Sequence, residues 1–285
     1  MNTDFTVITY NVCWEAMTNT NSRSHPQISN ICSNGNCQNN VLKWLDRDYS
    51  ICCIQEANLD LDRLPLKSYH HVFRSQSGKE PMITIIDESR WKVLKALGYE
   101  FSVGRPIQCL LLEDRLTNNI LGLINVHAGH HEDNNIFNLS RVLKSELTDW
   151  YYLVTALIVA GDFNKEYWPA DLLIKTPTTI KAVTTDLSKD LITDLTKDLP
   201  NHLSTDLPTD LDYKEFKNNW LLSGLNSLNT CCDISYNNQN EDHKPRKPCD
   251  YIAYTSNLRS DDHKLDIISG PASDHHPIIG QFSWN

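Results

Sequence analysis

The sequence predicts an α/β sandwich in a single domain. Short apolar runs with β-branched character recur along all 285 residues, and such runs are typical of strands. Only a few amphipathic segments lie between them, which does not match the strict strand–helix alternation of a βα barrel. Because no Gly- or Pro-rich linker divides the chain, we assign residues 1–285 to one domain.

The predicted strands are runs of alternating or continuous apolar residues. They are Phe5–Thr9, Ser50–Ile54, His70–Phe73, Met82–Ile86, Ile107–Leu112, Ile120–Val126, Ala156–Ala160, Asp250–Tyr254 and His276–Phe282. Apolar residues at helical spacing predict three helical segments, which are Asn40–Trp44, Ile136–Tyr152 and Glu215–Leu228.

The net charge and hydropathy of the sequence exclude some classes of protein. A formal net charge of −10 argues against broad nonspecific adhesion to nucleic acid, which depends on Lys and Arg. A divalent cation bound by carboxylates can still present positive charge to a phosphate. The chain begins without the basic start and apolar run of a secretory signal. No apolar run approaches the roughly 20 residues of a membrane helix, so we expect an intracellular protein, cytoplasmic or nuclear, without a membrane span. We further expect a monomer.

The nine cysteines are predicted to be buried thiols. Cys52 and Cys53 lie in an apolar strand, where cysteine behaves as a small hydrophobe. Cys32 and Cys37 have no second pair at the spacing of a zinc site. This usage favours a reducing compartment.

Residues Thr184–Leu211 form a low-complexity run of tetrapeptides that each end in leucine. A period of four drifts by about 40° per repeat on an α-helix, so the leucines do not form one fixed face. Pro200 and Pro208 would interrupt a long helix. We interpret the run as an insertion in a surface loop, with a docking element for a partner as the alternative.

Polar residues interrupt the ends of the predicted strands in a recurring way. Any one of them is commonly a turn former or a hydrogen-bonded surface residue. Together, and in this order, they predict a shared site: Asn11 in "VITYN", Glu56 in "CCIQE", His127 in "LINVH", Asp162 and Asn164 in "LIVAGDFN", Asp250 in "KPCDYIAY", and Asp274 with His275 in "SDHHPI".

The series TYN, IQE, NVH, GDFN, CDY and SDHHP resembles the endonuclease/exonuclease/phosphatase superfamily, which has the DNase-I-like fold. The resemblance spans Thr9 to Pro277. It implies a four-layer α/β/β/α sandwich of two mixed β-sheets with outer helices, and an active site at one end of the sheets. It also implies Mg²⁺-dependent hydrolysis of a phosphoester, with Mn²⁺ as a substitute.

A set of metal ligands follows from this resemblance. Glu56 is the expected Mg²⁺ ligand, since Mg²⁺ prefers carboxylate oxygens. Asn11 is expected beside it, on metal or phosphate, and Asp274 is expected to share the metal or a second metal position.

The resemblance also implies the catalytic groups. His275 would contact the phosphate, with its ring oriented by Asp250. Asp162 would orient or deprotonate the attacking water. Asn164 would donate to phosphate oxygens, and His127 would act on the phosphate or the leaving group.

Arg105 in "GRPIQ" is a candidate for a bidentate contact to a substrate phosphate. The alternative is a solvated charge at the start of a strand.

Three functions remain open on these residues. The first is a nuclease or DNA-end-processing phosphodiesterase acting on nucleic acid, as endonuclease or exonuclease; the motif set is most similar to the tyrosyl-DNA phosphodiesterase and general nuclease branches. The second is a phosphatase or phosphodiesterase of an inositol phosphate or phospholipid. The third is a catalytically silent binding protein. Since every expected polar position holds a competent residue, the third is disfavoured.

Overall fold

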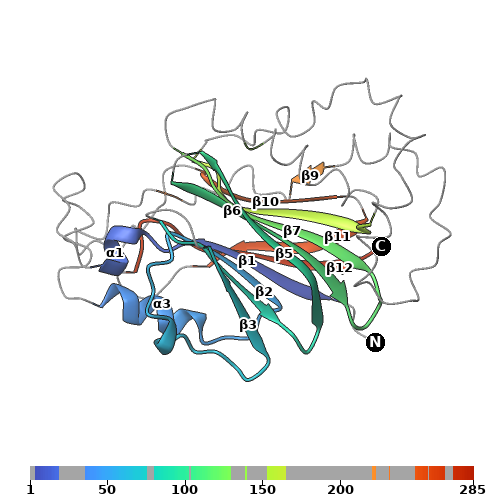
Figure 1. Ribbon diagram of the computed structural model, residues 1–285, viewed down its shortest axis with the longest axis horizontal. Helices are drawn as coiled ribbons and strands as arrows, with labels where there is room; N and C mark the ends of the chain where they lie inside the picture. Colours follow the sequence, from blue (N-terminus) through green and yellow to red (C-terminus); the bar gives the residue numbers. More distant parts are fainter. Residues whose placement is uncertain are drawn as a thin grey trace.

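The structure is a computed structural model (Figure 1) whose described residues form twelve strands in two sheets. The described residues are 4–18, 36–75, 80–102, 104–129, 139, 153–164, 220–222, 231, 248–255, 257–266 and 272–285. The predicted helix Ile136–Tyr152 lies outside them except for Leu139, and the repeat Thr184–Leu211 lies wholly outside them.

The two predictions on those segments therefore stay untested. Among the described residues, no helix is long and apolar enough to cross a membrane.

Two mixed six-stranded sheets form the core of the fold. The first sheet has the strand order β11-β12-β1-β2-β4-β3, and the second has the order β5-β6-β7-β8-β10-β9. Within the first sheet β1 and β2 are parallel, and within the second β7 and β8 are parallel. This arrangement confirms the predicted sandwich of two mixed sheets. The strands of the first sheet are β1 (Phe5–Asn11), β2 (Ile51–Gln55), β3 (His70–Arg74), β4 (Ile83–Asp87), β11 (Leu258–Leu265) and β12 (Ile278–Trp284).

Every predicted strand is confirmed, with bounds that shift by a few residues. Sequence analysis missed β5, β9 and β11, which all lie at sheet edges. The strands of the second sheet are β5 (Trp91–Ser102), β6 (Arg105–Asp114), β7 (Ile120–His127), β8 (Ala156–Asp162), β9 (Trp220–Leu222) and β10 (Asp250–Thr255).

The helix predicted over Glu215–Leu228 is wrong where the structure describes it. Residues Trp220–Leu222 form β9, which pairs antiparallel with β10. Over so few residues the apolar pattern of a helix cannot be distinguished from that of a short strand. Here pairing with β10 produces a strand. The predicted helix Asn40–Trp44 is confirmed as α3 (Cys37–Leu45).

Helices cover the outer face of the first sheet (Figure 1). The short helix α1 (Trp14–Thr18) and helix α3 pack there against outward side chains such as Ile8 and Tyr10 of β1. A short 3-10 helix, η1 (Leu61–Arg63), lies in the connection that follows β2. On the outer face of the second sheet, Leu139 belongs to a separate apolar cluster.

Side chains that alternate along each strand fill the space between the two sheets. Phe5 and Val7 of β1 point inward and pack with residues such as Leu121 and Leu123 of β7. Because successive side chains point to opposite faces, the inward positions continue to the strand ends. The inward positions near those ends are polar.

A buried polar network occupies the middle of this inter-sheet space. Gln55 Nε2 donates to Asn125 Oδ1 at 2.8 Å, and Asn125 Nδ2 donates to Thr84 Oγ1 at 3.0 Å. Thr84 Oγ1 in turn donates to Gln108 Oε1 at 2.7 Å, and Gln55 Nε2 also lies 3.1 Å from Thr9 Oγ1. Partnered groups of this kind hold two sheets in one register, because any slip would leave buried polar atoms without partners.

The cysteines depart from the predicted pattern at two positions. Cys37 and Cys231 are disulfide-bonded, whereas Cys52 and Cys53 are free and buried as expected. Disulfides are typical of oxidising compartments. The prediction of unpaired thiols is therefore wrong at Cys37 and Cys231, and cysteine usage no longer supports a reducing compartment.

Candidate functional site

Strand register brings three of the predicted residues into one row of the second sheet. His127 at the end of β7 is paired with Asp162 at the end of β8, and Asp250 at the start of β10 is paired with the same Asp162. All three side chains are buried. The row continues the inward positions of the three strands, so its side chains face the first sheet.

Asn11 connects this row to the first sheet. Its Nδ2 donates to Asp162 Oδ2 at 2.8 Å and to Glu56 Oε1 at 2.9 Å. Its Oδ1 accepts a hydrogen bond from the backbone N–H of Cys13 at 2.9 Å. The side-chain nitrogen of Asn11 therefore donates to two carboxylates, Glu56 next to the first sheet and Asp162 in the second.

Glu56 lies just beyond β2, where the chain turns. Its φ of 53° is unusual for a residue other than glycine. Its Oε2 accepts a hydrogen bond from the backbone N–H of Trp14 at 2.7 Å. Two donors thus fix the direction of the carboxylate before any metal or substrate binds.

Gly161 allows β7 and β8 to approach closely at the site. Its φ is +150°, and a Cβ at this position would lie 2.0 Å from the carbonyl oxygen of Val126. Only glycine fits such an approach. The glycine of the GDFN motif thereby sets the distance between His127 and Asp162.

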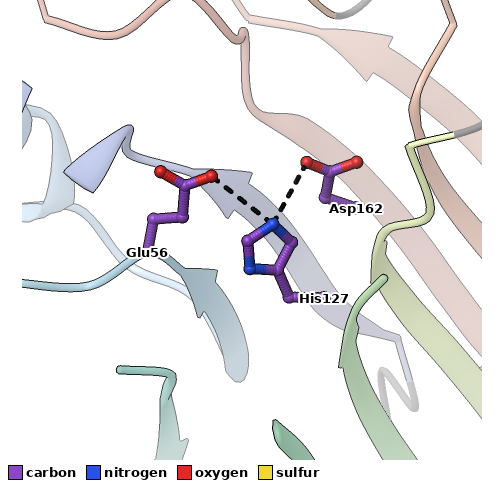
Figure 2. Close-up of side chains that lie close together, drawn as sticks. All are labelled: Glu56, His127 and Asp162. Atoms are coloured by element: carbon purple, nitrogen blue, oxygen red, sulfur yellow. Dashed lines mark ion pairs between the residues drawn. The ribbon is translucent and has the colours of Figure 1, made fainter. Parts of the chain in front are cut away.

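Figure 2 shows His127 between the carboxylates of Glu56 and Asp162. Its Nε2 lies 3.4 Å from Glu56 Oε1 and 3.8 Å from Asp162 Oδ2. The three side chains offer ligand atoms that all lie within 4.8 Å of one another. Two carboxylates with an imidazole fit a divalent cation, and the oxygens suit Mg²⁺.

His275 and Asp250 form a buried pair at the other side of Asp162. The ring Nδ1 donates to Asp250 Oδ2 at 2.9 Å, and Nε2 lies 3.8 Å from Asp162 Oδ2. Burial lowers the pKa of His275, but the charges of Asp250, Asp274 and Asp162 outweigh it, so the pKa is raised well above its usual value. The ring is therefore held as the imidazolium at neutral pH.

The loop before β12 fixes the backbone of His275. Ser273 Oγ donates to the carbonyl oxygen of Asn11 at 2.8 Å and accepts from the backbone N–H of His275 at 3.0 Å. Asp274 Oδ1 lies 4.0 Å from His275 Nε2. Burial raises the pKa of the Cys13 thiol, and the charges of both Asp274 and Glu56 add to that rise. Asp274 is in neither cluster of possible metal-ligand atoms found among the described residues.

Burial and the charge of Asp250 raise the pKa of Asp162. The nearby rings of His275 and His127 act in the opposite direction, as does the hydrogen bond from Asn11. Buried acids whose pKa is perturbed by burial and by specific charged neighbours are common at functional sites.

Asn164 lies two residues beyond the end of β8. Its φ is 50°, its backbone N–H donates to Asp162 Oδ1 at 2.7 Å, and its Nδ2 donates to the carbonyl oxygen of Ala128 at 2.7 Å. It supports Asp162 from the backbone, and its expected contact to phosphate stays a prediction.

Glu80 is a further charged residue of the site that the strand-end pattern did not predict. This residue lies just before β4 and forms an ion pair with Arg105, the residue that we expected at a substrate phosphate. Burial raises the pKa of Glu80 to about 7, the charge of Glu56 adds to the rise, and Arg105 opposes it. No strand-end pattern marks Glu80 in the sequence, because it belongs to the connection between β3 and β4.

Comparison with solved structures shows the same chain topology elsewhere. The whole chain aligns with 99% of an endonuclease/exonuclease/phosphatase family protein from Bacteroides thetaiotaomicron, with a TM-score of 0.65 and 11% identity. The fold is that of the endonuclease/exonuclease/phosphatase proteins. The predicted fold class is thus confirmed, while no family model and no curated protein matches the sequence.

Two further structures with this endonuclease/exonuclease/phosphatase fold have more specific descriptions. A mannosyl-6-phosphatase from Bacteroides thetaiotaomicron aligns over 98% of this chain and 100% of its own, with a TM-score of 0.62 and 12% identity. TDP2 from D. rerio, complexed with a single-strand DNA product, aligns over 99% of this chain and 100% of its own, with a TM-score of 0.56 and 15% identity.

Proposed function

We propose that this protein is a Mg²⁺-dependent phosphoesterase that hydrolyses phosphodiester bonds in nucleic acid. The observation that carries the proposal is the convergence on Asp162. Its Oδ2 accepts from Asn11 at 2.8 Å and lies 3.8 Å from Nε2 of both His127 and His275. A buried acid between two imidazoles is suited to moving a proton beside an anionic substrate.

His275 would stabilise the charge that develops on the phosphate. Its imidazolium is fixed by Asp250 through Nδ1, so that the opposite nitrogen is free to donate toward the centre of the site. A preformed donor in a buried site needs little reorganisation during the reaction.

Asp162 would orient the attacking water and accept its proton. Asn11 and the backbone N–H of Asn164 each occupy one oxygen of the carboxylate and hold its direction. The raised pKa of Asp162 brings it closer to the operating pH, where a general base is most effective.

The metal would be held by the Glu56 carboxylate, which belongs to the cluster of possible ligand atoms around His127. Mg²⁺ would supply positive charge that neutralises a bound phosphate, with Mn²⁺ as a substitute. Asn11 holds Glu56 in place for this role. We retain Asp274 as a further proposed ligand because it is a carboxylate at the site, with Oδ1 4.0 Å from His275 Nε2.

The choice of nucleic acid rests on the motif set and on the DNA-bound structure with the same fold. The alternative substrate is a small phosphorylated molecule, such as an inositol phosphate, or a phospholipid. The sugar phosphatase with the same fold favours that alternative.

A substrate panel tests the proposal. It contains single-stranded and duplex oligonucleotides, 5′-phosphotyrosyl DNA, inositol phosphates, mannose 6-phosphate and a sphingomyelin analogue, each with Mg²⁺ or with EDTA. We expect cleavage of nucleic acid that EDTA abolishes, and loss of that cleavage in Asp162→Asn. Turnover of only the small phosphates or the lipid would establish the alternative, and the absence of any turnover and of Mg²⁺ binding would refute phosphoesterase activity.

A further inference from the structure

The connection between β11 and β12 carries two residues of the site, Asp274 and His275, and a hydrogen bond joins its two ends. The backbone N–H of Asp266 donates to the carbonyl oxygen of Pro277 at 3.0 Å. Asp266 directly follows β11, and Pro277 directly precedes β12. Asp266 and residues 272–277 are the described part of this connection. The way in which Asp266 is held therefore affects where His275 lies.

The C-terminal end of helix α3 holds the carboxylate of Asp266. Trp44 Nε1 donates to Asp266 Oδ2 at 3.1 Å, and Arg47 Nη1 donates to the same oxygen at 2.5 Å. Arg47 is itself fixed, since its Nε donates to the carbonyl oxygen of Trp44 at 2.9 Å. Its guanidinium carbon also lies 4.2 Å from the centroid of the Trp44 ring. Two donors from one helix end thus converge on one carboxylate oxygen.

The Trp44 ring links this contact to the strand that carries Asn11. It packs edge-on against Tyr10, with ring centroids 5.3 Å apart, and Tyr10 directly precedes Asn11 on β1. Ala272 of the connection belongs to the same buried apolar cluster as both rings. The next residue, Ser273, donates through Oγ to the carbonyl oxygen of Asn11 at 2.8 Å. The connection is therefore attached to α3 before His275 and to β1 beside it.

We propose that Asp266 is a positioning residue for His275. Held by α3, it keeps the β11–β12 connection in the place where the ring faces the centre of the site. This inference rests on the proposed function, in which His275 stabilises charge on the phosphate. The side chains of Arg47 and Asp266 are 35% and 30% exposed, and water screens such a pair, so it contributes little to global stability. Its contribution is to direction, because misplacing a catalytic group by about 1 Å can lower the rate by about 10²-fold.

Asp266→Ala tests this role, because it removes the acceptor of both donors. We expect kcat to fall by about 10²-fold and KM to change little, since His275 acts on charge that develops during the reaction. Asp266→Asn should retain most of the activity, because its side-chain oxygen can still accept from Trp44 and Arg47. An unchanged kcat in Asp266→Ala would overturn the proposal, as would equal losses in the two variants.

A matched control lies at the same end of α3. Asp46 is the C-cap residue of the helix, and its Oδ1 lies 2.9 Å from Lys67 Nζ in an exposed ion pair. Asp46→Ala removes this pair and leaves the contacts of Asp266 in place, so kcat should be unchanged. A loss as large as that in Asp266→Ala would show that the helix end, and not its contact with Asp266, determines the activity.

Amide hydrogen exchange gives a readout that does not depend on turnover. The backbone N–H of His275 donates to Ser273 Oγ at 3.0 Å, so its exchange reports whether this part of the connection opens locally. We expect Asp266→Ala to exchange faster than the wild type over residues 272–276 and at the same rate over β8. Unchanged exchange over residues 272–276 would refute the positioning role. If the substrate panel shows no activity, the proposed function fails, and the exchange rates still decide whether Asp266 holds the connection.

Discussion

Asp162 and Asp250 are directly paired across the antiparallel strands β8 and β10, so two buried carboxylates are neighbours. Like charges at such positions destabilise a sheet. His275 offsets that repulsion, because Nδ1 binds Asp250 at 2.9 Å and Nε2 faces Asp162 at 3.8 Å. The sheet register thus places two carboxylates where they favour the imidazolium form of His275.

Asp250→Asn tests this arrangement. The substitution removes the largest influence that raises the pKa of His275, so we expect an NMR titration to show a lower pKa for that ring. We also expect kcat to fall by about 10²-fold or more, since a positioned acid–base group contributes on that order. Asp62→Asn, in the exposed helix η1, is the control. A His275 pKa that does not move would show that Asp250 does not hold the charge.

Glu56→Gln tests the metal site. We expect the Mg²⁺ concentration for half-maximal activity to rise roughly tenfold or more, because an amide oxygen is a weaker ligand than a carboxylate. Thermal unfolding in EDTA should change little, since the glutamine oxygen can still accept from Asn11 or Trp14. An unchanged Mg²⁺ titration would exclude Glu56 as a ligand.

Gly161→Ala tests the close approach of β7 and β8. The backbone conformation alone should cost about 1–3 kcal/mol with a side chain present, and the overlap with the Val126 carbonyl adds to that cost. Gly98→Ala is the matched control, because a Cβ there meets nothing within 4 Å. Urea unfolding should separate the two variants, and equal stabilities would show that the strands can move apart freely.

Much of the site could be predicted because its residues end buried strands. Period-two alternation marks the strands, and a polar residue at an inward position marks their ends, as at His127 and Asp162. Glu80 could not be found in this way. It lies in a connection, and only the packing of the two sheets brings it to His127.

The strands β5 and β11 were not predicted for a different physical reason. The sequences of β5 and β11 contain charged residues throughout, such as Lys92 and Lys95 in β5. Both strands lie at sheet ends, where one side of the strand has no partner in the sheet. The apolar pattern that predicts buried strands is therefore weak in them.

The inter-sheet network was also not predicted, because its partners depend on how the sheets are packed. Asn125→Leu should destabilise the protein by about 1–3 kcal/mol, since Gln55 and Thr84 each lose a buried hydrogen bond. The double variant with Gln55→Leu should lose less free energy of unfolding than the sum of the losses in the two single variants, because the two side chains share one hydrogen bond. Urea unfolding of the four proteins measures this coupling, and strict additivity would contradict a connected network.

His70 provides a pH test away from the site. Its ring stacks on Tyr49 with centroids 5.1 Å apart, and its Nδ1 accepts from the backbone N–H of Lys67 at 3.2 Å. Burial is the largest influence on His70 and lowers its pKa; the charges of Asp87 and Asp48 oppose it, and the charge of Lys67 adds to it. The folded protein therefore favours the neutral ring.

The sign of the pH effect follows from that direction. Because the unfolded chain binds the proton at a higher pH, the stability from neutral His70 is fully present above about pH 6.5 and is lost as the pH falls through the folded pKa. We expect the free energy of unfolding of the wild type to decrease over this range relative to His70→Asn, which keeps an acceptor near Lys67 but does not titrate. Urea unfolding from pH 8 to pH 5 measures the difference, and parallel curves would show that protonation of this ring has no linkage to folding.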